Sequence, residues 1–232
     1  MPFGYPVMLE LSGRRCVVIG ADAVQEGKVE ALLAAGADDV LVVAPGPERR
    51  LRDIEAVHGV TVERRDWRAD DLNGAFVAVA ASRDAGERDA IGREARARRV
   101  LVNVMDDIPN CDWSAPSVVR RGELVLAIAT GGASPALAKK LRVHLASEFG
   151  EEWSEVSAVL REVRRQTSPL LPDLTTRARR WGEALDLDEA VSLVKQGRGD
   201  ELADRLRARL QIDEHADSTR VERDTAASEH TG

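Results

Sequence analysis

The sequence is poor in cysteine, histidine and aromatic residues, and it contains no long apolar run. Its two cysteines, Cys16 and Cys111, lie far apart and belong to no paired motif. This argues against a disulfide framework or a zinc site and fits a reducing compartment. The histidines show no metal-ligand spacing. No segment approaches membrane-spanning length, and the N-terminus lacks the pattern of a secretory signal. We therefore expect a cytoplasmic protein that uses no membrane and no resident metal.

Strong basic charge is also missing, because the net charge of the 232 residues is −7. The chain as a whole therefore does not indicate a nucleic-acid partner. Basic residues nevertheless gather in the middle of the chain, where a local anion site is expected: Arg120, Arg121, Lys139, Lys140 and Arg142. With 44% hydrophobic residues, the chain is long enough for one large core or two small ones.

Short apolar runs alternate with helical patterns over residues 1–112. Continuous apolar strands of this kind are typical of a parallel sheet covered on both faces. The pattern predicts an α/β, Rossmann-like doubly wound domain. The predicted strands are Arg15–Gly20, Asp39–Ala44, Val60–Glu63, Ala75–Ala81 and Val100–Met105, with helices at Val24–Ala35 and around Asp89–Arg98.

The pattern changes after Asp112. Residues 113–148 predict a small α+β segment, with strands Ser117–Arg121 and Glu123–Thr130 and a helix beginning at Ser134 and Pro135. Leu137, Leu141 and Leu145 recur at helical spacing and predict a buried stripe on that helix. Residues 149–212 predict a helical domain broken at Pro169 and Pro172, and residues 213–232 a disordered tail.

The turn after the first strand, "VVIGADAVQEGK", resembles a dinucleotide-binding turn but is incomplete. Gly20 keeps the first glycine position, while Asp22 stands where a second glycine is usual. Ala21 and Ala23 are small and allow close approach to the backbone, whereas the Asp22 carboxylate would oppose phosphates. From these residues alone, cofactor binding and simple turn formation are equally supported.

The second strand ends in Ala44, Pro45 and Gly46, without the acidic residue that usually binds a ribose. Any adenosine would then be recognised mainly through backbone and shape. Arg49 and Arg50 follow closely and could meet a 2′-phosphate, although exposed loop arginines are more often simply solvated.

The segment "VNVMDDIPNCDW" lies at the carboxyl end of the fifth strand, where parallel sheets bind ligands. Asp106 and Asp107 stand there side by side, next to apolar Met105 and Ile108. Like charge or partial burial would raise a carboxyl pKa and suit it to proton transfer. The simpler reading is a carboxylate pair that caps a turn before Pro109.

The segment "TGGASPALAKKLR" combines two glycines, a helix start and cations, which together suit an anion. Carboxylates would fit it as well as phosphate. The alternative is a glycine turn followed by a capped helix with a solvated cationic face.

Taken in order, these segments resemble the precorrin-2 dehydrogenase family, which includes bifunctional dehydrogenase/ferrochelatases of siroheme biosynthesis. The resemblance covers roughly residues 7–148. It is carried by the opening "VMLELSGRRCVVIGADAVQEGKVEALLAAGADDVLVVAP", by "DDLNGAFVAVAAS", and most specifically by "VNVMDDIPNCDWSAPSVVRRGELVLAIATGGASPALAKKLR". The last stretch is similar to the family's NV-x-D, C-D-[aromatic]-x-x-P and S/T-G-G-x-S-P segments in their order and spacing.

The resemblance implies NAD-dependent oxidation of precorrin-2 to sirohydrochlorin by a homodimer that pairs through the segment after Asp112. It implies Asp106 as the catalytic residue, and ferrous iron as a further substrate in relatives that also insert the metal. The implied cofactor-binding residues are Gly20, Ala21, Asp22, Ala23, Val24, Ala44, Pro45, Gly46, Ala81 and Ser82. The implied tetrapyrrole-binding residues are Asn103, Thr130, Gly131, Gly132, Ser134 and Lys139.

This chain departs from the family pattern at Ala21, Asp22, Gln25 and Gly27 in the first turn and helix, and at Arg88 after the fourth strand. Two alternatives stay open, the first of them because of the altered glycine turn. One is a tetrapyrrole chelatase or carrier that has lost NAD chemistry. The other is a nucleotide-sensing regulatory protein, against which the Ala44–Pro45 strand end argues.

Overall fold

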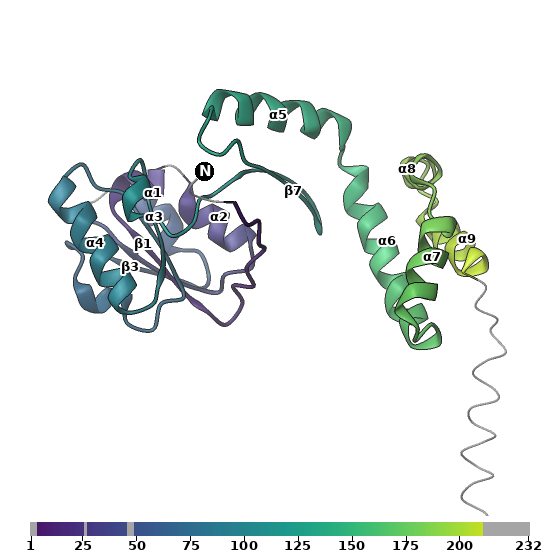
Figure 1. The fold of residues 1–232 in the computed structure, drawn as a ribbon, viewed down its shortest axis with the longest axis horizontal. Helices are drawn as coiled ribbons and strands as arrows, with labels where there is room; N and C mark the ends of the chain where they lie inside the picture. Colours follow the sequence, from purple (N-terminus) through teal and green to yellow (C-terminus); the bar gives the residue numbers. More distant parts are fainter. Residues whose placement is uncertain (1–3, 26, 46–48, 211–232) are drawn as a thin grey trace, which may run out of the picture. The chain divides into compact units, whose positions relative to one another are not determined.

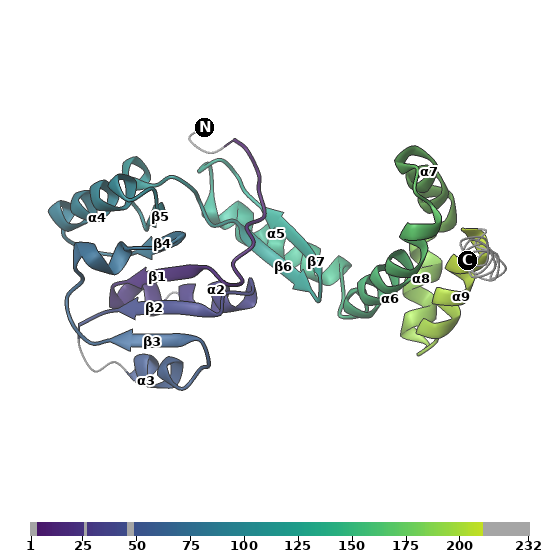
Figure 2. The ribbon, with the colours of Figure 1, turned by 90° about the horizontal axis from the view of Figure 1, so that it is seen from below.

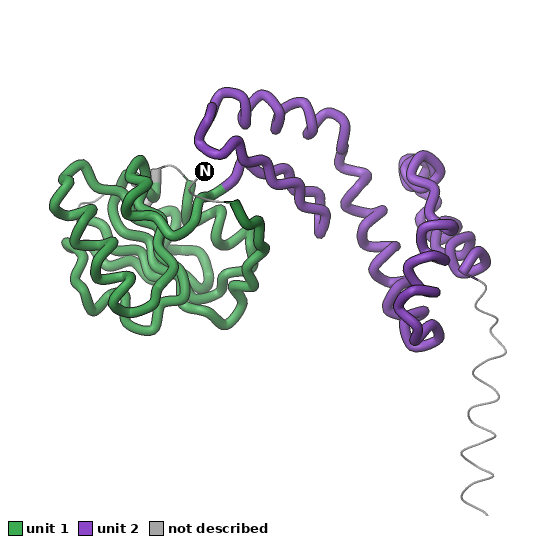
Figure 3. The backbone as a smooth tube through the Cα atoms, viewed as in Figure 1, with its two compact units in different colours: residues 1–115 green, residues 116–232 purple. Residues whose placement is uncertain are grey.

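The computed structural model describes residues 4–25, 27–45 and 49–210 (Figure 1). The chain divides into two compact units, Met1–Ala115 and Pro116–Gly232 (Figure 3). The Gly46 position and the predicted tail at 213–232 lie outside the described residues.

The first unit is built on a five-stranded parallel sheet in the order β3-β2-β1-β4-β5 (Figure 2). This confirms the predicted Rossmann-like fold. After β1 the chain adds β2 and β3 on one side of it and then returns to add β4 and β5 on the other side. The strand order therefore reverses between β1 and β4, which is where ligands bind in such sheets. The strands are β1 (Arg15–Ile19), β2 (Asp39–Val43), β3 (Val60–Glu63), β4 (Val77–Ala80) and β5 (Leu101–Val104).

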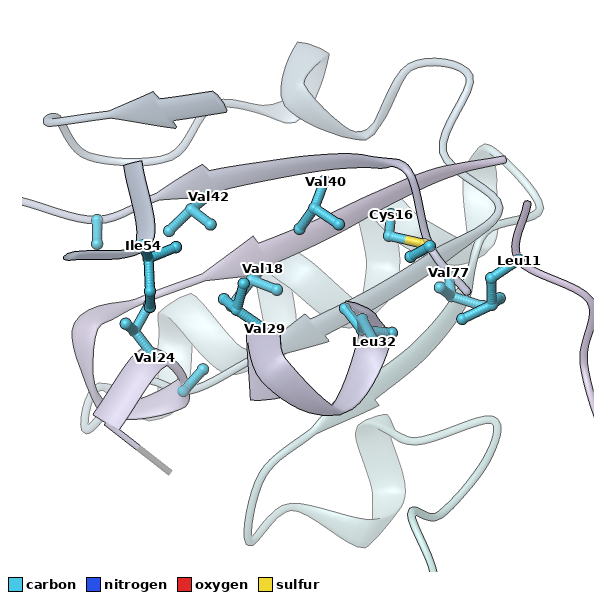
Figure 4. Packing of buried hydrophobic residues seen from close by; sticks show 13 residues of the cluster. Leu11, Cys16, Val18, Val24, Val29, Leu32, Val40, Val42, Ile54 and Val77 are labelled. Atoms are coloured by element: carbon cyan, nitrogen blue, oxygen red, sulfur yellow. The ribbon is translucent and has the colours of Figure 1, made fainter. Parts of the chain in front are cut away.

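Alternate residues of each strand face opposite sides of the sheet, so the unit has two cores. On one face Cys16 and Val18 of β1 pack with Val24 and Val29 (Figure 4). On the other face Val17 and Ile19 pack in a second cluster. The elements around the sheet are α1 (Ala21–Gln25), α2 (Lys28–Ala34), α3 (Arg49–Glu55), η1 (Ala69–Leu72), α4 (Ala85–Ala97) and η2 (Ile108–Asn110).

The predicted helix Val24–Ala35 is wrong in its start and its continuity. The structure has α1 immediately after β1, and α2 begins at Lys28. Gly27 between them has φ 72°, a left-handed conformation that interrupts a helix and that glycine adopts at little cost. The turn therefore opens onto a helix of only five residues, which carries a smaller dipole than the predicted one.

The second unit begins with a β-hairpin and a helix that bury little. Strands β6 (Ser117–Arg121) and β7 (Leu124–Ile128) pair in an antiparallel two-stranded sheet, followed by α5 (Pro135–Glu148). Ser134 caps α5 as predicted, because its hydroxyl accepts from the Leu137 N–H at 3.1 Å. The predicted buried stripe is wrong: Leu137 and Leu141 are 48% and 38% exposed, and α5 has no buried residue.

The rest of the second unit is helical, as predicted. Val156 and Val163 are buried in a core completed by Leu193, Leu202 and Leu206. No described helix is both long and apolar enough to cross a membrane. The helical elements are α6 (Glu152–Thr167), η3 (Ser168–Leu170), α7 (Leu174–Ala184), α8 (Leu187–Lys195) and α9 (Gly199–Arg209).

Candidate functional site

The turn at Gly20 lies at the reversal point of the sheet and contacts the end of β4 directly. Gly20 has φ 94°, and a Cβ built there would lie 2.1 Å from the carbonyl oxygen of Ala81. Its N–H donates to the carbonyl of Val43 at 2.9 Å, which ties the turn to the end of β2. Only glycine satisfies both the backbone angle and this approach. The ends of β1, β2 and β4 are therefore held together at one point.

Two cavities open at this edge of the sheet, and both are lined by Ala81. The larger has a volume of about 520 Å³ and the smaller about 170 Å³. The larger is lined by Asp22, Ala81, Ser82, Arg83, Arg88, Met105 and Asp106. The smaller is lined by Ile19, Gly20, Ala21, Val43, Pro45, Asp66, Trp67, Ala81 and Glu87.

The Asp22 carboxylate faces the larger cavity beside a cation. Its Oδ2 lies 3.4 Å from the Nε of Arg83, whose side chain is almost fully exposed. An exposed pair of this kind contributes about 1 kcal/mol or less to stability. Its effect on the site is to offset the negative charge that Asp22 brings to the first turn.

Arg88 connects the loop after β4 to the loop after β5. Its Nη1 donates to the carbonyl oxygens of Ser82 and Arg83 at 3.1 and 3.2 Å, and its Nε donates to Asp107 Oδ2 at 2.9 Å. The Asn110 amide also donates to Asp107 Oδ2, at 3.2 Å. The Arg88 guanidinium, with the Asn110 amide, holds the pKa of the Asp107 carboxyl below its usual range. The expectation of a raised pKa in this carboxylate pair is wrong for Asp107, which stays ionised and anchors the loop.

Asp106 differs from its neighbour in both conformation and contacts. Its φ is 59°, an uncommon value for a residue other than glycine. It is exposed and lines the larger cavity, and no described residue forms a hydrogen bond or ion pair with its carboxylate. Strained residues of this kind concentrate at functional sites. Asp106 therefore offers a free acceptor at the cavity, positioned by the anchored Asp107.

Asn103 lies within β5 and holds the segment that follows. Its Nδ2 donates to the carbonyl of Trp113 at 2.9 Å and to the Cys111 sulfur at 3.6 Å. The Cys111 thiol donates to the carbonyl of Val104 at 3.0 Å, and burial raises its pKa. These contacts fix the strand end that carries Asp106.

The other predicted cofactor-binding residues are of two kinds, those that are buried and those that line a cavity. Ala23, Val24 and Ala44 are fully buried, so only their backbone could reach a ligand. Pro45 is exposed and lines the smaller cavity, and Ser82 lines the larger one. The crevice thus offers backbone groups and small side chains along the first turn.

The predicted tetrapyrrole residues of the second unit form a structured turn. Gly131 and Gly132 adopt φ 62° and 83°, and the Ser134 N–H donates to the hydroxyl of Thr130 at 3.3 Å. Lys139 is exposed on α5, in the second turn of the helix. The turn presents polar groups and a nearby cation, as an anionic ligand requires.

Eight cavity residues were not predicted from the sequence as site residues: Ile19, Val43, Asp66, Trp67, Arg83, Glu87, Arg88 and Met105. Arg88 had been noted only as a departure from the family pattern. Each lies at or beyond the end of a strand that was predicted, so the ligand-binding edge of the sheet was the available signal. In the part of the chain described, no group of three or more His, Cys, Asp or Glu residues is arranged to hold a metal ion.

The position of the first turn fits a dinucleotide. Gly20 lies where the strand order reverses, and its turn adjoins two cavities at that edge of the sheet. Residues 7–117 match the family described as putative NAD(P)-binding. The match spans nearly the whole of the first unit, which is therefore similar to this NAD(P)-binding family.

Curated relatives are similar to this chain beyond its first unit. Siroheme synthase of Pseudoalteromonas atlantica is 29% identical over 211 residues, which cover 91% of this chain and 45% of that protein. Siroheme synthase of Chromobacterium violaceum is 31% identical over 208 residues, covering 90% and 43%. The chain thus spans less than half the length of these curated relatives.

A solved structure is similar over the whole of its own chain. SirC, a precorrin-2 dehydrogenase, superposes with a TM-score of 0.67 and 28% sequence identity. The superposition covers 88% of this chain and 100% of that one. The NAD(P)-binding unit and the following segments therefore share the architecture of SirC.

Proposed function

We propose that this chain is a precorrin-2 dehydrogenase, which oxidises precorrin-2 to sirohydrochlorin with NAD as the electron acceptor in siroheme biosynthesis. The observation that carries the proposal is Asp106, which lines the larger cavity of the first unit with a left-handed backbone and with no described partner for its carboxylate. Similarity to SirC over its full length supports the same activity. In the balanced reaction, precorrin-2 and NAD give sirohydrochlorin, NADH and a proton.

The residues that would hold NAD are those of the first turn and the neighbouring strand ends. Gly20 and Ala21 would contact it through the backbone, and Pro45, Ala81 and Ser82 would line its path. When bound, NAD supplies the acceptor for a hydride from the macrocycle. The ion pair with Arg83 lowers the electrostatic cost of Asp22 at this turn.

Asp106 would take or orient the proton that leaves the macrocycle as it is oxidised. The Asp106 carboxylate has no hydrogen-bond or ion-pair partner among the described residues and can accept this proton, whereas Asp107 is engaged by Arg88 and Asn110. A positioned general base typically contributes roughly 10²–10⁴-fold to a rate. The carboxylate groups of a tetrapyrrole would in turn be received by cationic and polar groups, for which Thr130 and Lys139 are the proposed residues.

We also propose that the protein is a homodimer that pairs through the β6–β7–α5 segment. In the single chain Val119 is the only residue of these three described elements that is buried. Val118, Leu137, Leu141 and Val143 leave apolar side chains exposed. A two-stranded hairpin with one helix is marginal by itself, so a second copy that covers these side chains would stabilise it. Cytoplasmic localisation stays a prediction, supported by two free thiols.

The test is an anaerobic assay with enzymatically made precorrin-2, with and without NAD, following NADH and sirohydrochlorin absorbance. We expect both products to form only when NAD is present. Tetrapyrrole binding without oxidation would refute the proposal and favour the chelatase-or-carrier alternative. Adding ferrous iron or cobalt to sirohydrochlorin in a parallel assay tests whether the same protein inserts a metal.

A further inference from the structure

The smaller cavity lies beside the ends of β1 and β2, on the other side of the first turn from Asp106. Gly20 and Ala21 line it, whereas the next residue, Asp22, lines the larger cavity. A dinucleotide that follows the first turn would therefore have one half in each cavity. The half opposite the reacting end of a dinucleotide is its adenosine.

The charged side chains among the described residues of this smaller cavity are both acidic, Asp66 and Glu87. The Glu87 carboxylate accepts a short hydrogen bond from the Ser82 hydroxyl, so it is already engaged. Asp66 is exposed, and no described residue forms a hydrogen bond or ion pair with its carboxylate. The adjacent Arg65 donates to the backbone carbonyl of Asp66 at 3.1 Å, but its guanidinium holds the carboxylate of Asp71, at 2.7 and 2.8 Å, and not that of Asp66.

Asp66 reaches the edge of the sheet where β2 offers no acid. It follows β3, which pairs with β2 in parallel register, Val43 opposite Glu63. Dinucleotide folds commonly place an acid at the end of β2 to accept the hydroxyls of the adenosine ribose. Here β2 ends in Ala44 and Pro45, and Pro45 lines the same cavity as Asp66. A carboxylate from the neighbouring strand thus stands beside the position where the usual one is missing.

We propose that the Asp66 carboxylate accepts the adenosine ribose hydroxyls of the dinucleotide and thereby excludes a 2′-phosphate. A free carboxylate can accept both hydroxyls of a vicinal diol, because it has two oxygens and no donor to satisfy. A phosphate dianion in the same cavity would meet Asp66 and Glu87, and neither lysine nor arginine is among the described residues that line this cavity; the side chains of Arg49 and Arg50 lie outside the described part. The assignment rests on the proposed use of NAD and adds the residue that distinguishes it from NADP.

The test is a binding titration, which does not depend on turnover. Trp67 lines the cavity, so quenching of tryptophan fluorescence reports occupancy by NADH or NADPH. We expect wild type to prefer NADH. In Asp66→Asn, NADH affinity should fall roughly tenfold through loss of a charge-assisted hydrogen bond, and NADPH affinity should rise. Asp66→Glu keeps the charge, so it should weaken NADH binding and still exclude NADPH.

Asp70→Asn is the matched control. It removes the same charge four residues away, and its side chain is 87% exposed and lines neither cavity. It should leave both affinities unchanged. The inference is overturned if the ratio of NADH affinity to NADPH affinity is unaltered in Asp66→Asn, or if binding of both ligands is weakened equally. So does a wild type that binds neither dinucleotide. Discrimination that depends on Asp66 in a protein that fails to oxidise precorrin-2 would instead refute the proposed function and keep the inference.

Discussion

Replacing Gly20 with alanine should loosen the point where the ends of β1, β2 and β4 meet. The added methyl group would lie 2.1 Å from the Ala81 carbonyl oxygen, far inside a van der Waals contact of roughly 3.5 Å. The clashing atom belongs to the backbone of the strand end, so it cannot move aside as a flexible side chain would. The first turn and the β4 end must therefore separate, and both border the two cavities.

Gly36→Ala separates the two contributions to this cost. Gly36 has φ 91°, close to the 94° of Gly20, but a Cβ there meets nothing within 4 Å. Gly36→Ala should therefore cost only the backbone strain of about 1–2 kcal/mol. Gly20→Ala carries the same strain plus the clash, and overpacking typically adds about 1–3 kcal/mol.

Amide hydrogen exchange resolves the two effects, because it reports local opening in each strand. In Gly20→Ala we expect faster exchange in β1 and β4 and weaker binding of NADH. In Gly36→Ala both should stay close to wild type near the cavities. Equal exchange and equal NADH affinity in the two variants would refute the close contact between Gly20 and Ala81.

Three further outcomes are expected. Asp106→Asn should lower kcat by roughly 10²–10⁴-fold with NADH affinity unchanged; a wild-type kcat would remove Asp106 from catalysis. The Arg65 guanidinium keeps the Asp71 carboxyl pKa below its usual range, so this pair stabilises above pH ~4 and is lost as the pH falls through the folded-state pKa. Asp71→Asn should cost about 1.5–3 kcal/mol at neutral pH in urea unfolding, the contribution of hydrogen bonds to a charged group, and almost nothing in acid. Leu137→Glu should yield monomers in sedimentation, whereas Leu174→Glu, on α7, should not.

Most of the fold could be predicted because buried strands appear in the sequence as short apolar runs. Ser117–Arg121 and Val60–Glu63 were predicted with the bounds that the structure shows. The predictions failed where the conformation of a single residue sets the structure, and where an apolar face has no partner within the chain. Gly27 divides the first helix through its backbone angle, which periodicity does not reveal. The Leu137 stripe was assigned to a core, but helical spacing identifies only an apolar face and not what covers it.

The candidate site was predictable as an edge of the sheet but not as a set of contacts. Asp106 and Asp107 are adjacent in sequence, yet Arg88 pairs with one and leaves the other free. That distinction depends on the direction of two side chains in a turn, and spacing carries no information about it. Asp66 was missed because the usual ribose acid is sought at the end of β2, whereas this one follows β3.

The three hydrogen bonds of Arg88 have a consequence for anyone who would redesign this cavity. A planar guanidinium fixes the directions of its donors, so this one side chain holds the loops after β4 and β5 in a fixed relative position. A lysine at this position offers a single point charge and could not hold both loops in the same geometry. Enlarging the cavity for a bulkier substrate would therefore have to begin with Arg88 on α4, and only then with the other residues that line the cavity.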